Sequence, residues 1–284
     1  MSENIRIFQV FYNQATRAAL DPEFEPLDNS GNERPEWREY WPISRFLGSN
    51  TLEEGCYYGF LSPKFGVKTG LGGRQVKDFV AQADGADVVT FSPFPDQAAC
   101  YFNMFEQCEN HHPGAIAMAQ AFFDAVGMNL EVTRLVMDTR STVYCNYFVA
   151  KPVFWRRWKQ VLDRCLEHIG NPYSPVGARL NARTPYDNGY SPMWVMIMER
   201  VAATLLARDR DITVKNYPPF LLPLAHPVWT HLAAEIVALD ALKRSYLTTQ
   251  VMEYLQSYRA LQHRTIQAFQ QLSARGVAPV AAPA

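Results

Sequence analysis

The clearest indication of the fold comes from residues 143–169, VYCNYFVAKPVFWRRWKQVLDRCLEHI. The first part is β-branched and aromatic, which predicts a short buried strand over 143–149. Asn146 interrupts this apolar run, and a buried amide must find hydrogen-bond partners either in the protein or in a ligand. Pro152 is well placed to open a helix, because the first helical position needs no N–H. The stretch therefore predicts a strand that leads directly into a long helix.

Strands and helices are predicted to alternate on both sides of this unit. Strands are predicted over 5–12, 57–65 and 86–91, with a short edge strand over 212–217. Helices are predicted over 14–20, 74–83, 103–126 with a break at 112–114, and 193–207. We expect an ordered loop over 21–42 and a polar loop over 170–192 at the active face. This alternation predicts an α/β layer fold with one sheet flanked by helices.

After residue 226 the pattern becomes purely helical. Apolar residues at helical spacing predict two helices that form a C-terminal hairpin. We therefore divide the chain into a sheet domain (1–221), a helical extension (222–276) and a disordered tail (277–284). The hairpin could pack within the chain, form a homo-oligomer or contact an anionic membrane surface through Lys243, Arg244, Arg259 and Arg264.

The composition excludes some classes of function. The chain is 48% apolar and 19% charged with a net charge of −1, which argues against a nucleic-acid partner. The first residues do not resemble a signal peptide, and no apolar run reaches the roughly 18 residues of a spanning helix.

The five cysteines are irregularly spaced, as expected for reduced thiols. We expect a cytoplasmic protein, at the inner face of the membrane if it contacts lipid. Its 13% aromatic residues suit either carbohydrate contacts or core packing.

A glycine loop, GLGG at 70–73, precedes a predicted helix and has Lys64, Lys68 and Arg74 around it. Free N–H groups and the dipole of a helix start favour a diphosphate, whereas an ordinary turn would use the same glycines. The spacing is neither a Rossmann fingerprint nor a P-loop.

Histidines and cysteines do not form a zinc pattern. Cys100, Cys108, His111 and His112 lack a second cluster at zinc spacing. His112 is expected to contact a phosphate or a polar loop, or to be a buried structural residue.

Acidic residues supply the candidates for a general base. Glu199 lies on a helix whose other face is apolar, so it could activate a hydroxyl or form an ion pair with Arg200. Asp138 is a weaker candidate. Asp28, in the long loop, could bind a ribose or form an Asx turn.

The chain resembles bacterial glycosyltransferases that assemble capsule, O-antigen and other cell-surface polysaccharides. The resemblance lies in the order and character of IRIFQVFYN, YYGFLSPKF, ADVVTF, FNMFEQCENHHPG, VYCNYFVAKPVFWRRW and MWVMIMERVAATLLA, between residues 5 and 217. It implies a GT-A-like, Rossmann-type catalytic domain over 1–221. It also implies a nucleotide-sugar donor near the ends of the first strands and a glycan or lipid-linked acceptor near the later segments. The residues assigned to the donor are Tyr12, Asn13, Asp28, Lys64, Lys68, Arg74 and His112, and those assigned to catalysis are Glu199 and Asn146.

The chain departs from this family in lacking a DxD motif at a strand end, which would hold a divalent metal. Asp209 and Asp211 form a DRD that follows a helix. Ser62, Pro63 and Lys64 occupy the place of DxD. We therefore expect Lys64 and Lys68 to neutralise the diphosphate without Mn²⁺ or Mg²⁺.

Two other functions stay open from the sequence. The chain could be an inactive nucleotide- or carbohydrate-binding scaffold of a polysaccharide assembly complex. It could also be a structural protein whose C-terminal helices bind a partner.

Overall fold

A six-stranded sheet forms the centre of the computed structural model, which describes residues 4–186 and 189–277. The strand order is β2-β1-β3-β5-β4-β8, and β5 runs antiparallel to its two neighbours while the other pairs are parallel. The strands are β1 (Ile5–Phe11), β2 (Glu25–Asp28), β3 (Tyr57–Leu61), β4 (Val88–Thr90), β5 (Phe148–Ala150) and β8 (Val214–Asn216). The predicted single sheet flanked by helices is thus confirmed as an α/β fold.

The strand order reverses at β1. From β1 the chain passes through α1 (Gln14–Ala18) to β2 on one side, and then through α2 (Tyr40–Ser49) to β3 on the other side. In open α/β sheets, the crevice outside the carboxyl ends of the strands at such a switch point is the usual place for a ligand. The topology therefore directs attention to the ends of β1 and β3.

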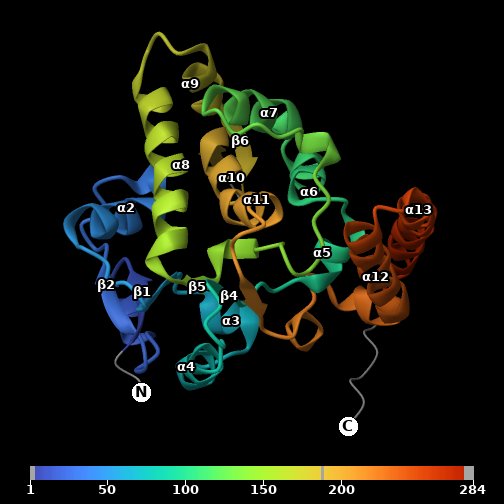
Figure 1. The fold of residues 1–284 in the computed structure, drawn as a ribbon, viewed down its shortest axis with the longest axis horizontal. Coiled ribbons are helices and arrows are strands. Elements are labelled where there is room, and N and C mark those ends of the chain that lie inside the picture. Colours follow the sequence, from blue (N-terminus) through green and yellow to red (C-terminus); the bar gives the residue numbers. More distant parts are fainter. Residues whose placement is uncertain (1–3, 187–188, 278–284) are drawn as a thin grey trace.

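Helices cover both faces of the sheet (Figure 1). Ile7 packs with α3 and α4 on one face, whereas its neighbour Phe8 packs with α2, α8, α10 and α11 on the other. Adjacent residues point to opposite faces because side chains alternate along a strand. These helices are α3 (Phe65–Thr69), α4 (Gly73–Ala81), α8 (Pro152–Gly170), α10 (Met193–Met198) and α11 (Val201–Arg208), with α6 (Met104–His111), α7 (Ala115–Ala125) and α9 (Pro175–Leu180) beyond them.

The last two helices, α12 (Ala233–Thr249) and α13 (Met252–Ala274), lie beside α5 (Pro95–Cys100) at one edge of the molecule (Figure 1). They share a third apolar cluster with α5. The buried Lys243 Nζ donates hydrogen bonds to the carbonyl oxygens of Ala98, Tyr101 and Met137. Most of the predicted tail, residues 278–284, lies outside the described residues. Within the described residues, no helix is long and apolar enough to cross a bilayer.

The strand predicted over 143–149 is wrong in its first half. Tyr144–Asn146 forms a 3-10 turn, and β5 begins only at Phe148. Cys145 and Asn146 have φ of 60° and 53°, a left-handed backbone that cannot continue a strand. The apolar pattern therefore predicted that this segment is buried, but it did not predict the backbone conformation. The helix predicted to open at Pro152 is confirmed.

Two other segments contain structure that the sequence did not predict. The loop predicted over 21–42 contains β2, a 3-10 turn at Pro35–Trp37 and the start of α2. The loop over 170–192 contains α9 and a hairpin of β6 (Arg183–Tyr186) and β7 (Gly189–Pro192).

The single helix predicted over 193–207 is interrupted between α10 and α11. The carbonyl of Met196 accepts a hydrogen bond from the Arg200 side chain, and the Arg200 backbone N–H turns to Ile197. The side chain thus competes with the main-chain bond that would have continued the helix.

Candidate functional site

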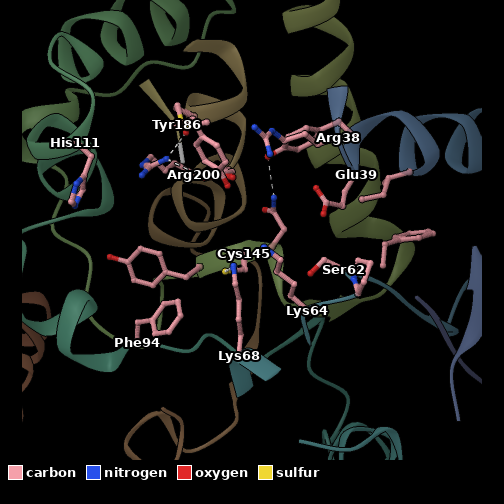
Figure 2. Close-up of a pocket in the computed structure, with 18 of the residues that line it drawn as sticks. Arg38, Glu39, Ser62, Lys64, Lys68, Phe94, His111, Cys145, Tyr186 and Arg200 are labelled. Atoms are coloured by element: carbon pink, nitrogen blue, oxygen red, sulfur yellow. Dashed lines mark hydrogen bonds and ion pairs between the residues drawn. The ribbon is translucent and has the colours of Figure 1, made fainter. Parts of the chain in front are cut away.

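A cavity of about 870 Å³ opens at the switch point of the sheet (Figure 2). Tyr12 follows β1, Ser62 follows β3, and Cys145 and Asn146 precede the antiparallel β5, so all four reach the same edge of the sheet. The volume lies in the range of roughly 300–1,000 Å³ that is typical of small-molecule sites. The switch point therefore holds a space large enough for a ligand.

The backbone around the cavity is strained. Of the seven non-glycine residues with positive φ among those described, five line the cavity: Asn32 (39°), Arg38 (50°), Phe94 (66°), Cys145 (60°) and Asn146 (53°). A left-handed backbone costs a non-glycine residue on the order of 1–3 kcal/mol, and residues strained in this way cluster at functional sites. This clustering favours the cavity as the functional site of the chain.

Cations outnumber carboxylates on the cavity wall. Of the residues that the structure describes, four cationic side chains and two carboxylates line it: Arg38, Lys64, Lys68 and Arg200, with Glu39 and Glu199. Among the described residues, Glu199 and Arg200 are the one ion pair with both partners on this wall, with 3.7 Å between Oε2 and Nη1. The cavity is therefore positive in a chain whose net charge is −1, and it favours an anionic ligand.

Lys68 and Cys145 meet in the middle of the cavity. Lys68 Nζ donates a hydrogen bond of 3.2 Å to Cys145 Sγ. Burial lowers the pKa of Lys68, but Cys145, Tyr186 and Glu199 together leave that pKa raised. Burial raises the pKa of Cys145 despite the lysine. At neutral pH the pair is an ammonium ion and a thiol, so Lys68 keeps its positive charge.

Glu199 is the carboxylate next to the fixed charge of Arg200. Its side chain is 32% exposed, and burial raises its pKa while Arg200 opposes the rise. Arg200 is held by hydrogen bonds to the carbonyl oxygens of Met104 (2.9 Å) and Met196 (2.5 Å) and to Gln107 Oε1 (3.0 Å). A carboxylate with a raised pKa beside an immobile cation is suited to proton transfer.

Two buried polar atoms on the wall have no partner among the described residues. Asn146 Nδ2 donates to the Tyr40 hydroxyl at 3.1 Å, which leaves Asn146 Oδ1 unpaired. The Tyr144 hydroxyl is also unpaired. Buried polar atoms in folded proteins nearly always have partners, so these two indicate a ligand or bound water in the cavity.

Six of the predicted site residues line the cavity: Tyr12, Lys64, Lys68, His112, Asn146 and Glu199. Asn13 lies outside it and caps α1, where its Oδ1 accepts from Thr16 N. Asp28 Oδ1 accepts from Ser30 N, and this bond lowers the pKa of Asp28. That contact is the Asx turn given above as the alternative to a ribose site.

The glycine loop does not face the cavity. Gly73 N donates to Asp21 Oδ2 at 2.7 Å, so the amino end of α4 is already closed by a carboxylate of the same chain. Arg74 pairs with Glu23 and Asp78 at 3.9 and 3.6 Å. The carboxylate of Asp21 therefore occupies the position that the sequence analysis gave to a diphosphate. Lys64 and Lys68, by contrast, do line the cavity.

His112 is both a cavity residue and a structural one. It is 9% exposed, its Nδ1 lies 2.9 Å from Thr184 Oγ1, and burial lowers its pKa. Cys100 and Cys108 are buried. Across residues 4–186 and 189–277, no group of three or more His, Cys, Asp or Glu side chains could hold a metal ion.

The other acidic candidates have partners elsewhere in the chain. Asp209 and Asp211 both bind Arg157, at 2.9 and 2.5 Å. Asp138 pairs with Arg140 at 2.6 Å and does not line the cavity.

The sequence analysis missed several cavity residues: Arg38, Glu39, Tyr40, Tyr144, Cys145 and Tyr186. Two signals pointed toward them. One is the mixed aromatic and charged run at 36–41, and the other is the expectation that the polar loop over 170–192 lies at the active face. The Arg38 guanidinium stacks 4.1 Å from the centre of the Tyr186 ring, which brings these two segments together over the cavity.

The chain matches no protein-family model, and neither a curated protein nor a solved structure is significantly similar to it.

Proposed function

We propose that this chain is a GT-A-like glycosyltransferase of surface polysaccharide biosynthesis. It would move a sugar from a nucleotide-sugar donor to a glycan or a lipid-linked acceptor. The observation that carries the proposal is a positive cavity, with a carboxylate of raised pKa on its wall, at the topological switch point of an α/β sheet. Such a cavity matches an anionic donor and a reaction that removes a proton from a hydroxyl.

The cations of the cavity supply the charge that a leaving diphosphate needs. Lys64 follows β3, and Lys68 lies on α3 immediately after it, so both ammonium groups belong to the edge where the strands end. As the bond to the sugar breaks, negative charge grows on the diphosphate, and fixed cations stabilise it without rearrangement. In this proposal the two lysines do the work of a divalent metal.

Glu199 is the proposed general base. Its carboxylate accepts the proton of the acceptor hydroxyl while that oxygen bonds to the anomeric carbon of the donor. The bond from the anomeric carbon to the diphosphate breaks, and the electron pair leaves with the nucleotide diphosphate. Arg200, 3.7 Å away, favours the ionised form of Glu199, and Asn146 Oδ1, which has no partner among the described residues, would orient a hydroxyl.

Calorimetric titration of the purified protein with UDP, GDP, CMP, dTDP and their sugars tests the donor site. We expect one nucleotide to bind and its sugar to be consumed when acceptors are added. Binding without turnover, over a broad acceptor panel, would replace the proposal with an inactive nucleotide-binding scaffold. The absence of any nucleotide binding would reject both functions.

Addition of EDTA to an active assay tests the role of the lysines separately. We expect turnover to persist. A loss of turnover that Mn²⁺ or Mg²⁺ restores would show that the lysines do not replace a metal.

A further inference from the structure

The cavity has two chemically different ends. Figure 2 shows His111 and Phe94 on one side of Cys145, and Lys64, Ser62 and Glu39 on the other. We call the first side the neutral end and define it by Phe94, Gln97, Gln107, His111 and Tyr144. Its members are aromatic rings, amides and an imidazole, whereas Lys64 lies at the opposite end and Lys68 lies between the two ends, beside Cys145. The two ends should therefore select different ligand groups.

Hydrogen bonds within the protein fix what each amide of the neutral end presents. Gln107 Oε1 accepts from Arg200 at 3.0 Å, so the Nε2 hydrogens of Gln107 remain as donors. Gln97 Nε2 donates to the buried Asp96 Oδ2 at 2.7 Å, so Gln97 Oε1 remains as an acceptor. One donor group and one acceptor thus line the same end, both uncharged.

The Tyr144 hydroxyl is a third hydrogen-bonding group of the neutral end. Tyr144 is 8% exposed, and its hydroxyl has no partner among the described residues. Burial raises its pKa, so the group is a neutral O–H that can donate and accept. Its ring lies 6.3 Å from the ring of Phe94, and together they give the neutral end an apolar wall with a polar edge.

We propose that the neutral end binds an uncharged sugar ring of the acceptor. Each sugar hydroxyl both donates and accepts, which matches Gln107 Nε2, Gln97 Oε1 and the Tyr144 hydroxyl, and the ring faces of Phe94 and Tyr144 suit its C–H surface. Arg200 borders this end, but its guanidinium already donates to three protein acceptors and pairs with Glu199 at 3.7 Å, so a phosphate or a uronic acid would gain less there than beside Lys64. The assignment of this sugar as an acceptor rests on the proposed function; the binding of a neutral sugar does not.

Titration by saturation-transfer NMR tests the subsite on the whole chain. The probes are the p-nitrophenyl glycosides of glucose, galactose, mannose and N-acetylglucosamine, with p-nitrophenyl glucuronide as the anionic comparison, each with and without UDP or GDP. We expect a neutral glycoside to bind more tightly than the glucuronide. Tyr144→Phe should weaken its binding about three- to tenfold, the loss of one neutral hydrogen bond.

Tyr57→Phe is the matched control. Tyr57 is also buried, but its hydroxyl donates to Ala86 O on the other face of the sheet, so this change should leave sugar affinity unaltered. Tyr144→Phe removes an unpartnered group and should not lower the melting temperature, so weaker binding cannot be ascribed to unfolding.

Three results would overturn the subsite: no glycoside binds, the glucuronide binds best, or Tyr144→Phe binds like the wild type. Binding of a neutral sugar that Tyr144→Phe weakens, in a protein that binds no nucleotide, would support the subsite and reject glycosyl transfer.

Discussion

Lys68 Nζ and Cys145 Sγ, 77 residues apart in sequence, lie 3.2 Å from each other at the centre of the cavity. The contact joins α3, which follows β3, to the left-handed turn ahead of β5. Because the sulfur is a weak acceptor, a phosphate oxygen would be a better partner for the ammonium. A donor diphosphate is therefore expected to take Lys68 from the thiol.

Cys145 should be the preferred site of alkylation by iodoacetamide. The other four cysteines are buried, and Cys145 alone is partly exposed. Burial raises its pKa, so the labelling rate should keep increasing with pH beyond the usual thiol value of about 8.5. Peptide mass spectrometry gives the site and the rate. A nucleotide that binds at Lys68 should slow labelling, and unchanged labelling at saturating nucleotide would place the donor elsewhere.

Replacement of either cavity lysine should weaken nucleotide binding. Lys68→Met and Lys64→Met each remove a cation that could bind a diphosphate, a contact typically worth about 1.5–3 kcal/mol, or roughly a 10- to 150-fold change in Kd. The effect should be smaller for the exposed Lys64 and should shrink at high salt. Calorimetry measures it. Lys77→Met is the control, because Lys77 pairs with Glu23 at 3.2 Å outside the cavity.

Glu199→Gln should lower turnover about 10²- to 10⁴-fold, the usual contribution of a general base, while donor affinity is retained. In the wild type, turnover should fall as acid protonates Glu199, at a pH above the usual carboxyl value because its pKa is raised. The raised pKa means that the folded protein binds this proton more tightly than the unfolded chain, so ionisation lowers stability as pH rises. Glu199→Gln should therefore be at least as stable as the wild type at pH 7. Wild-type turnover in this variant would remove Glu199 from the mechanism.

Lys243→Met should destabilise the fold by about 3–5 kcal/mol, because it leaves three carbonyl oxygens without their shared donor, and each unsatisfied buried group costs about 1–3 kcal/mol. Urea unfolding measures the change. Lys159→Met, which breaks a surface pair with Asp163, should cost less than about 1 kcal/mol. Equal losses in the two variants would contradict the anchoring role of Lys243.

Burial lowers the pKa of Lys243 to about 8, below the value of 10.5 for a free lysine. Between these two values the unfolded chain binds the proton and the folded protein does not, so this residue makes stability rise with pH across that window. The wild type should gain stability there relative to Lys243→Met. A flat difference between pH 8 and 10.5 would show that the three carbonyls hold the proton in place.

Strands β1, β3 and β4 could be predicted because they are short apolar runs with turn residues on both sides. Strand β2 could not, because its sequence, EPLD, contains no such run. The opening of α8 at Pro152 was equally clear. The turn at Cys145 and Asn146 could not be predicted, since burial selects the same apolar neighbours whether the backbone is extended or left-handed. The break at Arg200 escaped because it depends on a side chain bonding to a carbonyl within its own helix.

The candidate site was predicted where residues follow strands in sequence, as Tyr12 and Lys64 do. It was missed where the fold brings in distant segments: Arg38 and Tyr186 meet across the cavity although 148 positions separate them. The diphosphate site predicted at Gly73 was wrong for the same reason. The partner of Gly73, Asp21, lies 52 residues earlier, and no local pattern predicts that contact.

The left-handed residues around the cavity have a consequence for the evolution of this chain. Glycine adopts positive φ freely, so Asn32→Gly or Arg38→Gly would relieve local strain even as it removes a cavity contact. A selection for heat resistance alone would then be drawn to the very positions that shape the cavity, and its products would be expected to lose activity. The chain has side chains at these positions although glycine would be less strained there. Such a cost in stability is expected where the side chains are needed for function.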